Sequence, residues 1–248
     1  MFETFKVVNG IPLFLEDHCN RLQSGISYLG LVSKTVFNAA TLKPILRHLL
    51  VLNNCLNARV RLTVFRSGNS LYFPDSNQIS WHLSCSKLED TGDSLLKHEI
   101  KLGWFSEEVK SPGKLSNLKT LNGLIYILAA NFAVKHGFDD VLINNSNGDF
   151  IESIHSNLFI LKDNILFTPP LSDGCLEGVM RKNLIQMATS QGFICNEVSI
   201  GLPLLENADE ILLTNVIRGV QSVKHFNGKV YANATGIKLN SGILHHLR

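Results

Sequence analysis

The chain has 248 residues, of which 45% are hydrophobic and 18% are charged, and its formal net charge at neutral pH is +2. This is enough apolar sequence for a sizeable core. Lys and Arg are dispersed, so we expect no electrostatic binding to nucleic acid or to a membrane. No signal peptide or long apolar span is evident, so we expect a reduced, cytoplasmic protein. Its cysteines are odd in number and lack metal-like spacing, which predicts no metal site: Cys19, Cys55, Cys85, Cys175 and Cys195.

The first part of the sequence predicts a small α+β domain. Apolar residues recur with a helical period over residues 16–29 and 41–53, and they alternate as in a strand over residues 58–65 and 78–84. A Pro-Gly segment around residues 110–114 then predicts a linker. We therefore place the small domain at residues 1–110, the linker at 111–117 and a larger domain at 118–248.

The larger domain is predicted to have a mostly β core. It begins with a helix at about residues 122–136 and continues with a hairpin whose turn is Asn147-Gly148, a strong two-residue turn signal. Further strands are expected at residues 157–161 and 165–167, on either side of Asp163-Asn164. An amphipathic helix is expected at residues 181–189.

Two residues of this domain predict a particular chemistry. Lys119 adjoins an apolar segment, where desolvation favours the neutral, nucleophilic amine. Glu152 lies among apolar residues on the return strand of the hairpin, so it needs a cationic partner to stay ionised. Pyridoxal phosphate meets both requirements, because its aldehyde forms a Schiff base with a lysine and its protonated ring nitrogen pairs with a carboxylate. Each residue alone is more simply explained as a surface charge.

A phosphate site can be argued from Gly178, which precedes the helix at residues 181–189. The free N–H groups and the dipole at a helix start bind anions. Arg21, on the first predicted helix, is a candidate for the positive side chain, because a guanidinium matches the geometry of a phosphate. The simpler interpretations are a glycine cap and an exposed arginine.

Taken together and in order, these segments resemble the class IV aminotransferase-like, or fold-type IV, pyridoxal phosphate enzymes. This family includes branched-chain and D-amino acid aminotransferases and 4-amino-4-deoxychorismate lyase. The resemblance covers nearly the whole chain. It rests on Phe2-Glu3-Thr4-Phe5, His18-Cys19-Asn20-Arg21-Leu22, Lys119, Glu152-Ser153, Ser156-Asn157-Leu158-Phe159, Thr168-Pro169-Pro170, Gly178-Val179-Met180-Arg181 and Ala208-Asp209-Glu210.

The resemblance implies a fold, an assembly and a set of roles. We expect an α+β protein with a small α/β sandwich domain, a larger domain with a β-barrel-like core, and the cofactor in the cleft between them. Family members are usually homodimers, so we expect a homodimer that acts on a small amino substrate. The implied cofactor-binding residues are Lys119 as Schiff-base lysine and proton shuttle, Glu152 as partner of the ring nitrogen, Arg21 as phosphate ligand, Val179 and Met180 through their backbone amides, and Asn215.

Departures from the family patterns favour the lyase branch. Branched-chain enzymes place a Tyr where this chain has Leu124. The D-amino acid enzymes carry an Arg and a His in the loop after a Thr-Arg-Gly-like strand end, and the loop that follows Arg66-Ser67-Gly68 here lacks both. Aminotransferases carry a Thr where this chain has Val216, whereas Asn215 is typical of the lyases. We therefore expect 4-amino-4-deoxychorismate lyase activity, which eliminates pyruvate and gives 4-aminobenzoate for folate synthesis. The lyases commonly have an Arg where Ser70-Leu71 stands here.

Two other functions remain open: a class IV amino acid aminotransferase, and a degenerate protein that binds pyridoxal phosphate without catalysis. His155 and Tyr72 are the substrate-side candidates, although His155 is more simply explained as a structural histidine. The resemblance begins at Phe2, whereas family members usually carry about one further strand ahead of this point. The chain is then either naturally short or begins at a misplaced start, and a partner subunit is one way to complete the active site.

Overall fold

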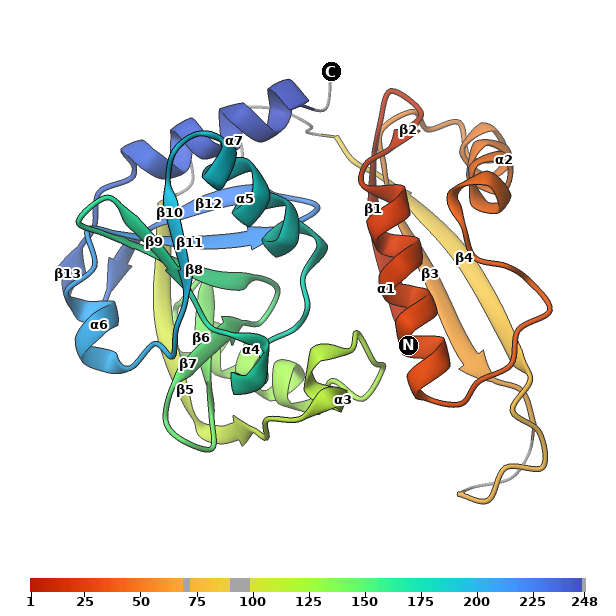
Figure 1. Cartoon of the computed structure of the whole chain (residues 1–248), viewed down its shortest axis with the longest axis horizontal. Coiled ribbons are helices and arrows are strands. Elements are labelled where there is room, and N and C mark those ends of the chain that lie inside the picture. The colour runs from red at the N-terminus through yellow and green to blue at the C-terminus, as the bar shows by residue number, and fades with distance from the viewer. Residues whose placement is uncertain (69–71, 90–98, 247–248) are drawn as a thin grey trace. The chain divides into compact units, whose positions relative to one another are not determined.

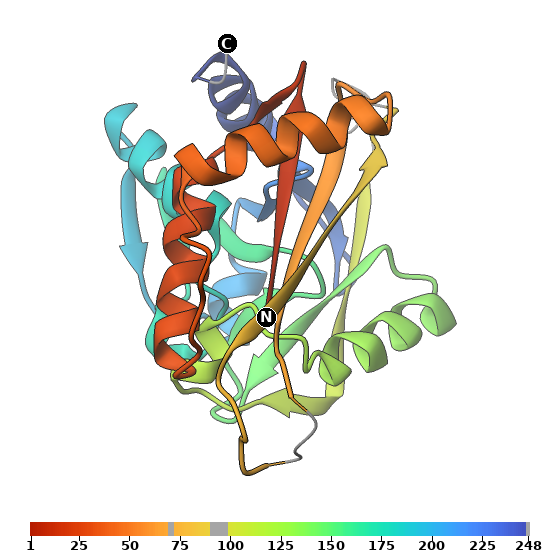
Figure 2. The same cartoon turned by 90° about the vertical axis from the view of Figure 1, so that its right-hand side faces the viewer.

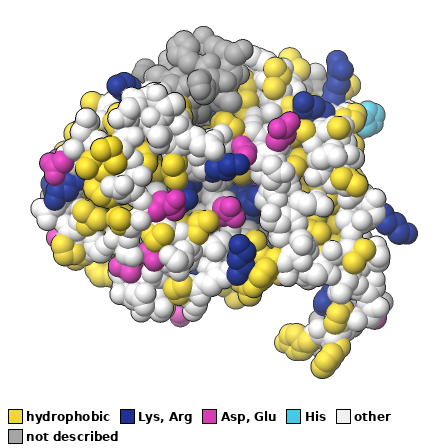
Figure 3. All heavy atoms as spheres, viewed as in Figure 1, with side chains coloured by type: hydrophobic (Ala, Val, Ile, Leu, Met, Phe, Trp, Pro, Cys, Tyr) yellow, Lys and Arg dark blue, Asp and Glu magenta, His cyan; other side chains and the backbone are white. Residues whose placement is uncertain are grey.

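A computed structural model describes residues 1–68, 72–89 and 99–246 (Figure 1). The chain folds into two compact units. The first consists of the described residues of Met1–Thr91 together with Leu118–Leu121, and the second of those of Gly92–Asn117 and Asn122–Arg248. No helix of the described ranges is both long and apolar enough to span a membrane. On the face drawn in Figure 3, basic and acidic side chains are interspersed.

The first unit is an antiparallel sheet with two helices packed on it (Figure 2). In β3, alternate residues are buried, so that one face of the sheet joins the leucines of the helices in one core. The predicted helices and strands of this part are confirmed to within a few residues. In sheet order the strands are β2 (Ile11–Pro12), β1 (Phe2–Val8), β3 (Ala58–Arg66) and β4 (Ile79–Lys87), and the helices are α1 (Leu15–Tyr28) and α2 (Ala39–Leu52).

The second unit is built on a larger mixed sheet that curls into a barrel. Pairing runs in the order β10-β9-β8-β11-β12-β5-β6-β7, and a further pairing of β7 with β8 closes the ring. The expected α+β fold with a β-barrel-like core is thereby confirmed. The strands are β5 (Ile100–Lys110), β6 (Asp140–Asn145), β7 (Phe150–Ser153), β8 (Asn157–Lys162), β9 (Ile165–Thr168), β10 (Ile194–Glu197), β11 (Glu210–Asn215), β12 (Gly219–Phe226) and β13 (Lys229–Val230).

Helices make the crossovers between parallel strands and cover the sheet. The crossover helix α4 links β5 to its parallel neighbour β6, and α5 links β9 to β10. Strand β6 is buried along its whole length, because Val141 and Ile143 pack against α4 while Leu142 joins the main core. The helices are α3 (Lys114–Asn117), α4 (Leu124–His136), the 3-10 turn η2 (Leu171–Asp173), α5 (Val179–Ser190), α6 (Leu202–Glu206) and α7 (Ala234–His246).

The hairpin that carries Glu152 has the predicted form. Gly148 adopts a positive φ of 87°, a conformation that favours glycine. The side-chain oxygen of Asn145 accepts hydrogen bonds from the backbone N–H groups of Asn147 and Asp149, which holds the turn together. Glu152 follows on β7, paired with Ile143 of β6 and Asn157 of β8.

The two units are not divided as the sequence suggested. Strand β5, which we had placed in the small domain, belongs to the second unit because it pairs in parallel with β6 and β12. The expected linker at residues 111–117 contains α3 and also belongs there. Leu118–Leu121 groups instead with the first unit, where the backbone N–H of Phe2 donates to the carbonyl of Lys119 at 2.9 Å. Parallel pairing between distant segments leaves no local mark in the sequence.

Candidate active site

Glu152 is held by donors from three parts of the second unit. Its Oε1 accepts hydrogen bonds from Lys110 Nζ at 2.5 Å and from the Tyr126 hydroxyl at 2.7 Å, and its Oε2 accepts one from the Leu176 backbone N–H at 2.8 Å. The carboxylate is buried, with a side chain that is 4% exposed. Because an ionised carboxylate offers about four acceptor positions, one position remains for a further donor.

The two side chains on Oε1 are themselves firmly positioned. Tyr126 lies in the first turns of α4, and its burial and the charge of Glu152 raise the pKa of its hydroxyl, so that it remains a donor. Lys110 ends β5, is 12% exposed, and also donates to the carbonyl of Ser116 at 2.9 Å. The carboxylate therefore sits between β5, α4 and the loop before α5.

The start of α5 is an uncapped helix N-terminus next to this acid. Gly178 is the N-cap residue, no described side chain caps the helix, and the first two helical residues, Val179 and Met180, are buried. The first N–H groups of a helix have no partner within it and carry the positive end of its dipole. Leu176, which donates to Glu152, stands two residues before Gly178. The acid and the helix start are therefore neighbours.

Gly178 allows a close approach that no larger residue could make. A Cβ atom at this position would lie 1.8 Å from Oδ1 of Asn157, although the backbone φ of −72° is itself open to any residue. Asn157 is fixed by its own hydrogen bond to the carbonyl of Leu176 at 2.8 Å. The glycine thus lets β8 meet the loop before α5.

A buried hydroxyl without a partner lies on the same side of the sheet as Asn157. Thr214 of β11 stands directly opposite Asn157 in the ladder, and directly paired residues share a face. Its Oγ1 is buried and has no hydrogen-bond partner among the described residues. Such groups are uncommon in folded proteins, so this one is suited to a polar ligand atom.

Asn215, the next residue, shapes the turn that leaves β11. Its Oδ1 accepts hydrogen bonds from the backbone N–H groups of Ile217 at 3.0 Å and Arg218 at 2.8 Å, and its Nδ2 donates to Ser156 Oγ at 2.9 Å. These bonds tie β11 to the loop between β7 and β8. The side chain of Asn215 is therefore an organiser of this loop cluster.

The cluster suits pyridoxal phosphate by its donor and acceptor set. The remaining acceptor position of Glu152 fits a protonated ring nitrogen, while the uncapped start of α5 and the unpartnered Thr214 hydroxyl fit a phosphate. The residues that would hold the group are Glu152 at the ring, and Val179 and Met180 at the phosphate.

Lys119 belongs to the first unit. It is half-buried next to the buried Leu118, and its Nζ lies 4.6 Å from the centre of the Phe2 ring. Together with the hydrogen bond from the Phe2 N–H, this fixes Lys119 beside the first residues of β1. The expected apolar neighbourhood of this lysine is thus present in part.

Arg21 also lies in the first unit, where it is buried rather than exposed. Its Nε donates to Glu3 Oε1 at 2.8 Å and its Nη2 to Glu3 Oε2 at 2.5 Å, and His18 Nδ1 lies 2.7 Å from the same Oε2. Burial would raise the pKa of Glu3, but the Arg21 charge and the hydrogen bonds from His18 and Arg21 outweigh it and lower the pKa to about 2. Burial lowers the pKa of His18, which favours a neutral ring.

The two substrate-side candidates lie in different units. His155 is exposed in the loop between β7 and β8. Burial raises the pKa of the nearby Asp140, and the charge of His155 opposes this rise only in part. Tyr72, in the first unit, is 92% exposed. Ser70 and Leu71, on which part of the comparison with the lyases rested, lie outside the described residues.

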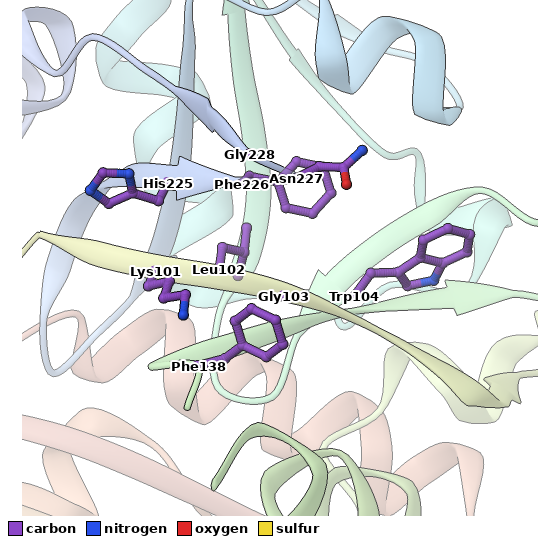
Figure 4. Close-up of a pocket in the computed structure, with 9 residues that line it drawn as sticks. All are labelled: Lys101, Leu102, Gly103, Trp104, Phe138, His225, Phe226, Asn227 and Gly228. Carbon is purple, nitrogen blue, oxygen red and sulfur yellow. The ribbon is translucent and has the colours of Figure 1, made fainter. Parts of the chain in front are cut away.

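A surface hollow of about 450 Å³ lies elsewhere on the second unit (Figure 4). Residues of β5 and β12 form most of it, and the side chain of Phe138 projects toward it. None of the expected site residues lines it, so it is not the predicted cofactor site. Its lining consists of Lys101, Leu102, Gly103, Trp104, Phe138, His225, Phe226, Asn227 and Gly228.

Sequence reasoning missed Lys110, Tyr126 and Glu3. Lys110 is the last residue of the predicted small domain, next to the expected linker, and Tyr126 stands two residues beyond the position at which branched-chain enzymes carry a tyrosine. Glu3 could have been found. It lies on the same face of β1 as the core residue Phe5, and a buried acid there requires a basic partner on the helix that covers it.

Comparison with known proteins shows the family of this chain. Residues 1–226 match the family described as amino-transferase class IV. A putative branched-chain-amino-acid aminotransferase of Methanocaldococcus jannaschii is 24% identical over 94% of this chain and 80% of its own length. For some other curated relatives the match spans much less, 33% and 26% of their lengths in two cases.

Solved structures of two lyases share the fold. The 4-amino-4-deoxychorismate lyase of Pseudomonas aeruginosa is 26% identical, with a TM-score of 0.86 over 100% of this chain and 90% of that one. A putative 4-amino-4-deoxychorismate lyase of Legionella pneumophila has a TM-score of 0.89 at 24% identity, over 100% and 91% of the two chains. With the family match over residues 1–226, the chain belongs to the class IV aminotransferases, a family of pyridoxal-phosphate-dependent enzymes.

Proposed function

We propose that the protein is a pyridoxal phosphate lyase that converts 4-amino-4-deoxychorismate into 4-aminobenzoate and pyruvate. In this reaction the ring carbon that bears the amine loses a proton, and the C–O bond to the enolpyruvyl group breaks. The enolpyruvate gains a proton to become pyruvate, so the reaction consumes no other reactant.

The residues of the second unit are proposed to bind and orient the cofactor. Glu152 accepts the ring N–H at its remaining acceptor position, while Lys110 and Tyr126 keep the carboxylate in place. The N–H groups of Val179 and Met180 bind the phosphate with the help of the α5 dipole. When bound, pyridoxal phosphate withdraws electrons from the substrate carbon that bears the amine.

Lys119 would hold the cofactor through its aldehyde and would also act as the base that takes up the proton of the substrate carbon. Arg21 is proposed as a further phosphate ligand, oriented by its bidentate pair with Glu3.

The observation that favours the lyase is the set of hydrogen bonds made by Asn215. In this family an Asn in the middle of the Thr214-Asn215-Val216 triplet is typical of the lyases, and here its side chain holds the turn after β11 and the loop before β8. Val216 has no hydroxyl to offer a phosphate, unlike the Thr of the aminotransferases. The 26% identity to the Pseudomonas aeruginosa lyase over the full chain supports the same assignment.

An aminotransferase is the second candidate. It is supported by the curated relatives, several of which are branched-chain aminotransferases, including the Methanocaldococcus jannaschii protein. Against it stands Leu124, which has no hydroxyl where the branched-chain enzymes carry one and is 73% exposed. In an aminotransferase, Lys119 would return its proton within the active site and the amino group would pass to a 2-oxo acid.

We also propose that the protein is a homodimer. Helix α4 exposes an apolar stripe formed by Leu124, Ile127, Leu128 and Val134, and such stripes commonly mark contact surfaces. A mass measured in solution by light scattering should be twice that of the chain, and Ile127→Glu should reduce it. A monomer at micromolar concentration would contradict this proposal.

Incubation of the cofactor-loaded protein with 4-amino-4-deoxychorismate tests the activity, with 4-aminobenzoate and pyruvate followed separately. We expect the two products in equal amounts. A parallel panel of L- and D-amino acids with 2-oxoglutarate tests the second candidate. Amino transfer without 4-aminobenzoate would overturn the lyase assignment, and a bound cofactor that responds to no substrate would indicate a degenerate binding protein.

A further inference from the structure

Lys110 is a charged group of the second unit to which the proposed mechanism gives no role beyond holding Glu152. It is nearly buried, and its Nζ lies 2.5 Å from Oε1 of Glu152 and 2.9 Å from the carbonyl of Ser116. A buried ammonium is costly unless it is paired. This lysine is therefore built into the site and is not a surface charge that happens to lie nearby.

The carboxylate of Glu152 is therefore already paired with a cation, the ammonium of Lys110, before a ligand binds. Lys110 and the neutral Tyr126 hydroxyl occupy Oε1, and the Leu176 N–H occupies one position of Oε2. A protonated ring nitrogen at the remaining position would be a second cation on the same carboxylate. The two cations repel each other, so each weakens the hold of Glu152 on the other.

We propose that Lys110 is a positioning residue that shares Glu152 with the cofactor ring nitrogen and thereby limits how strongly the site holds that nitrogen in its protonated form. This inference rests on the proposed function, since it requires the cofactor ring to lie at Glu152. The inference adds to that function a residue, Lys110, that influences whether the cofactor ring nitrogen is protonated. Lys110 thus tunes the electron-withdrawing strength of the bound cofactor through Glu152.

The test compares the affinity for pyridoxamine 5'-phosphate with that for its 1-deaza analogue, in which a C–H replaces the ring nitrogen. Both ligands carry an amine in place of the aldehyde, so Lys119 forms no bond to either. The ratio of the two dissociation constants, analogue over parent, isolates the contribution of the ring nitrogen. Because both ligands are titrated into the same preparation, a partly unfolded variant does not distort the ratio.

Lys110→Met should raise this ratio by roughly tenfold, because Glu152 loses the competing cation and depends on the ring nitrogen for its counter-charge. Lys110→Arg keeps the charge and should preserve the wild-type ratio. Lys101→Met removes an exposed lysine from the same strand and should leave the ratio unchanged. Glu152→Gln should bring the ratio close to one, both as a single variant and in combination with Lys110→Met.

The outcomes separate the inference from the function on which it rests. If the wild-type protein binds both ligands and Lys110→Met leaves their ratio unchanged or lowers it, the role of Lys110 is wrong while the cofactor assignment stands. If Lys110→Met weakens both ligands equally, the lysine serves only the local structure. If the wild-type protein binds neither ligand, the proposed function and this inference both fail.

Discussion

The buried acid of the first unit makes a quantitative prediction about stability. Glu3 is fully buried, and its pKa is lowered from 4.5 to about 2. Its folded pKa thus lies below its unfolded one, so the ionised carboxylate stabilises the fold above about pH 4.5 and loses this effect as the pH falls toward 2. This difference between the folded and unfolded pKa of Glu3 corresponds to about 3 kcal/mol of unfolding free energy, of which about 2 kcal/mol should be lost by pH 3.

The two tryptophans allow the unfolding of the first unit to be measured by itself. Trp81 of β4 packs edge-on against Phe37 in the first unit, and Trp104 lies in the second. In a Trp104→Phe background, Trp81 fluorescence in urea should report the unfolding of the first unit. The free energy of unfolding is compared between this protein and the same protein with Glu3→Gln, at several pH values from 7 to 3.

The difference in unfolding free energy between the two proteins should shrink by about 2 kcal/mol from pH 7 to pH 3. At low pH Glu3 becomes protonated and neutral, whereas Gln is neutral at every pH. Glu16→Gln, which removes an exposed carboxylate from α1, is the matched control, and its difference should vary by less than about 1 kcal/mol. A Glu3→Gln difference that is independent of pH would refute the assigned pairing with Arg21.

Three further predictions concern the second unit. Glu152→Gln should leave the cofactor bound but lower turnover by at least about 100-fold, since a neutral amide cannot hold a protonated ring nitrogen, and unchanged turnover would exclude Glu152 as its partner. Gly178→Ala should weaken pyridoxamine 5'-phosphate binding by about tenfold or more because its Cβ would displace Asn157, and adding Asn157→Ala should restore part of the affinity. Tyr126→Phe should lower the free energy of unfolding by about 1–3 kcal/mol in urea, because Glu152 keeps its burial but loses a donor; no change would show that the hydroxyl bond is not formed.

The acid was predictable because its position depends on local signals. Asn147-Gly148 specifies a tight turn, and the alternation that follows places Glu152 on the return strand. The start of α5 could also be anticipated from Gly178, although the helix begins at Val179, earlier than its periodicity suggested. Such features depend on residues within a few positions of one another.

The features that were missed depend on contacts between distant segments. Lys110 reaches Glu152, 42 positions away, only because β5 pairs in parallel with β6, whereas the sequence places the segment that carries Lys110 in the small domain. Arg21 is buried because β1 presents Glu3 to the covering helix α1, 18 positions further on. Turn and periodicity signals report the type of an element but not its partner, so these ion pairs could not be derived from them.

Lys119 is the residue proposed to bind the cofactor covalently. Reduction of the pyridoxal-phosphate-loaded protein with sodium borohydride fixes the cofactor to the lysine that holds it, and mass spectrometry of the peptides identifies that residue. We expect a single stoichiometric label on Lys119 and none on Lys110, whose ammonium is paired with Glu152. A label on Lys110, or one spread over several lysines, would contradict this assignment.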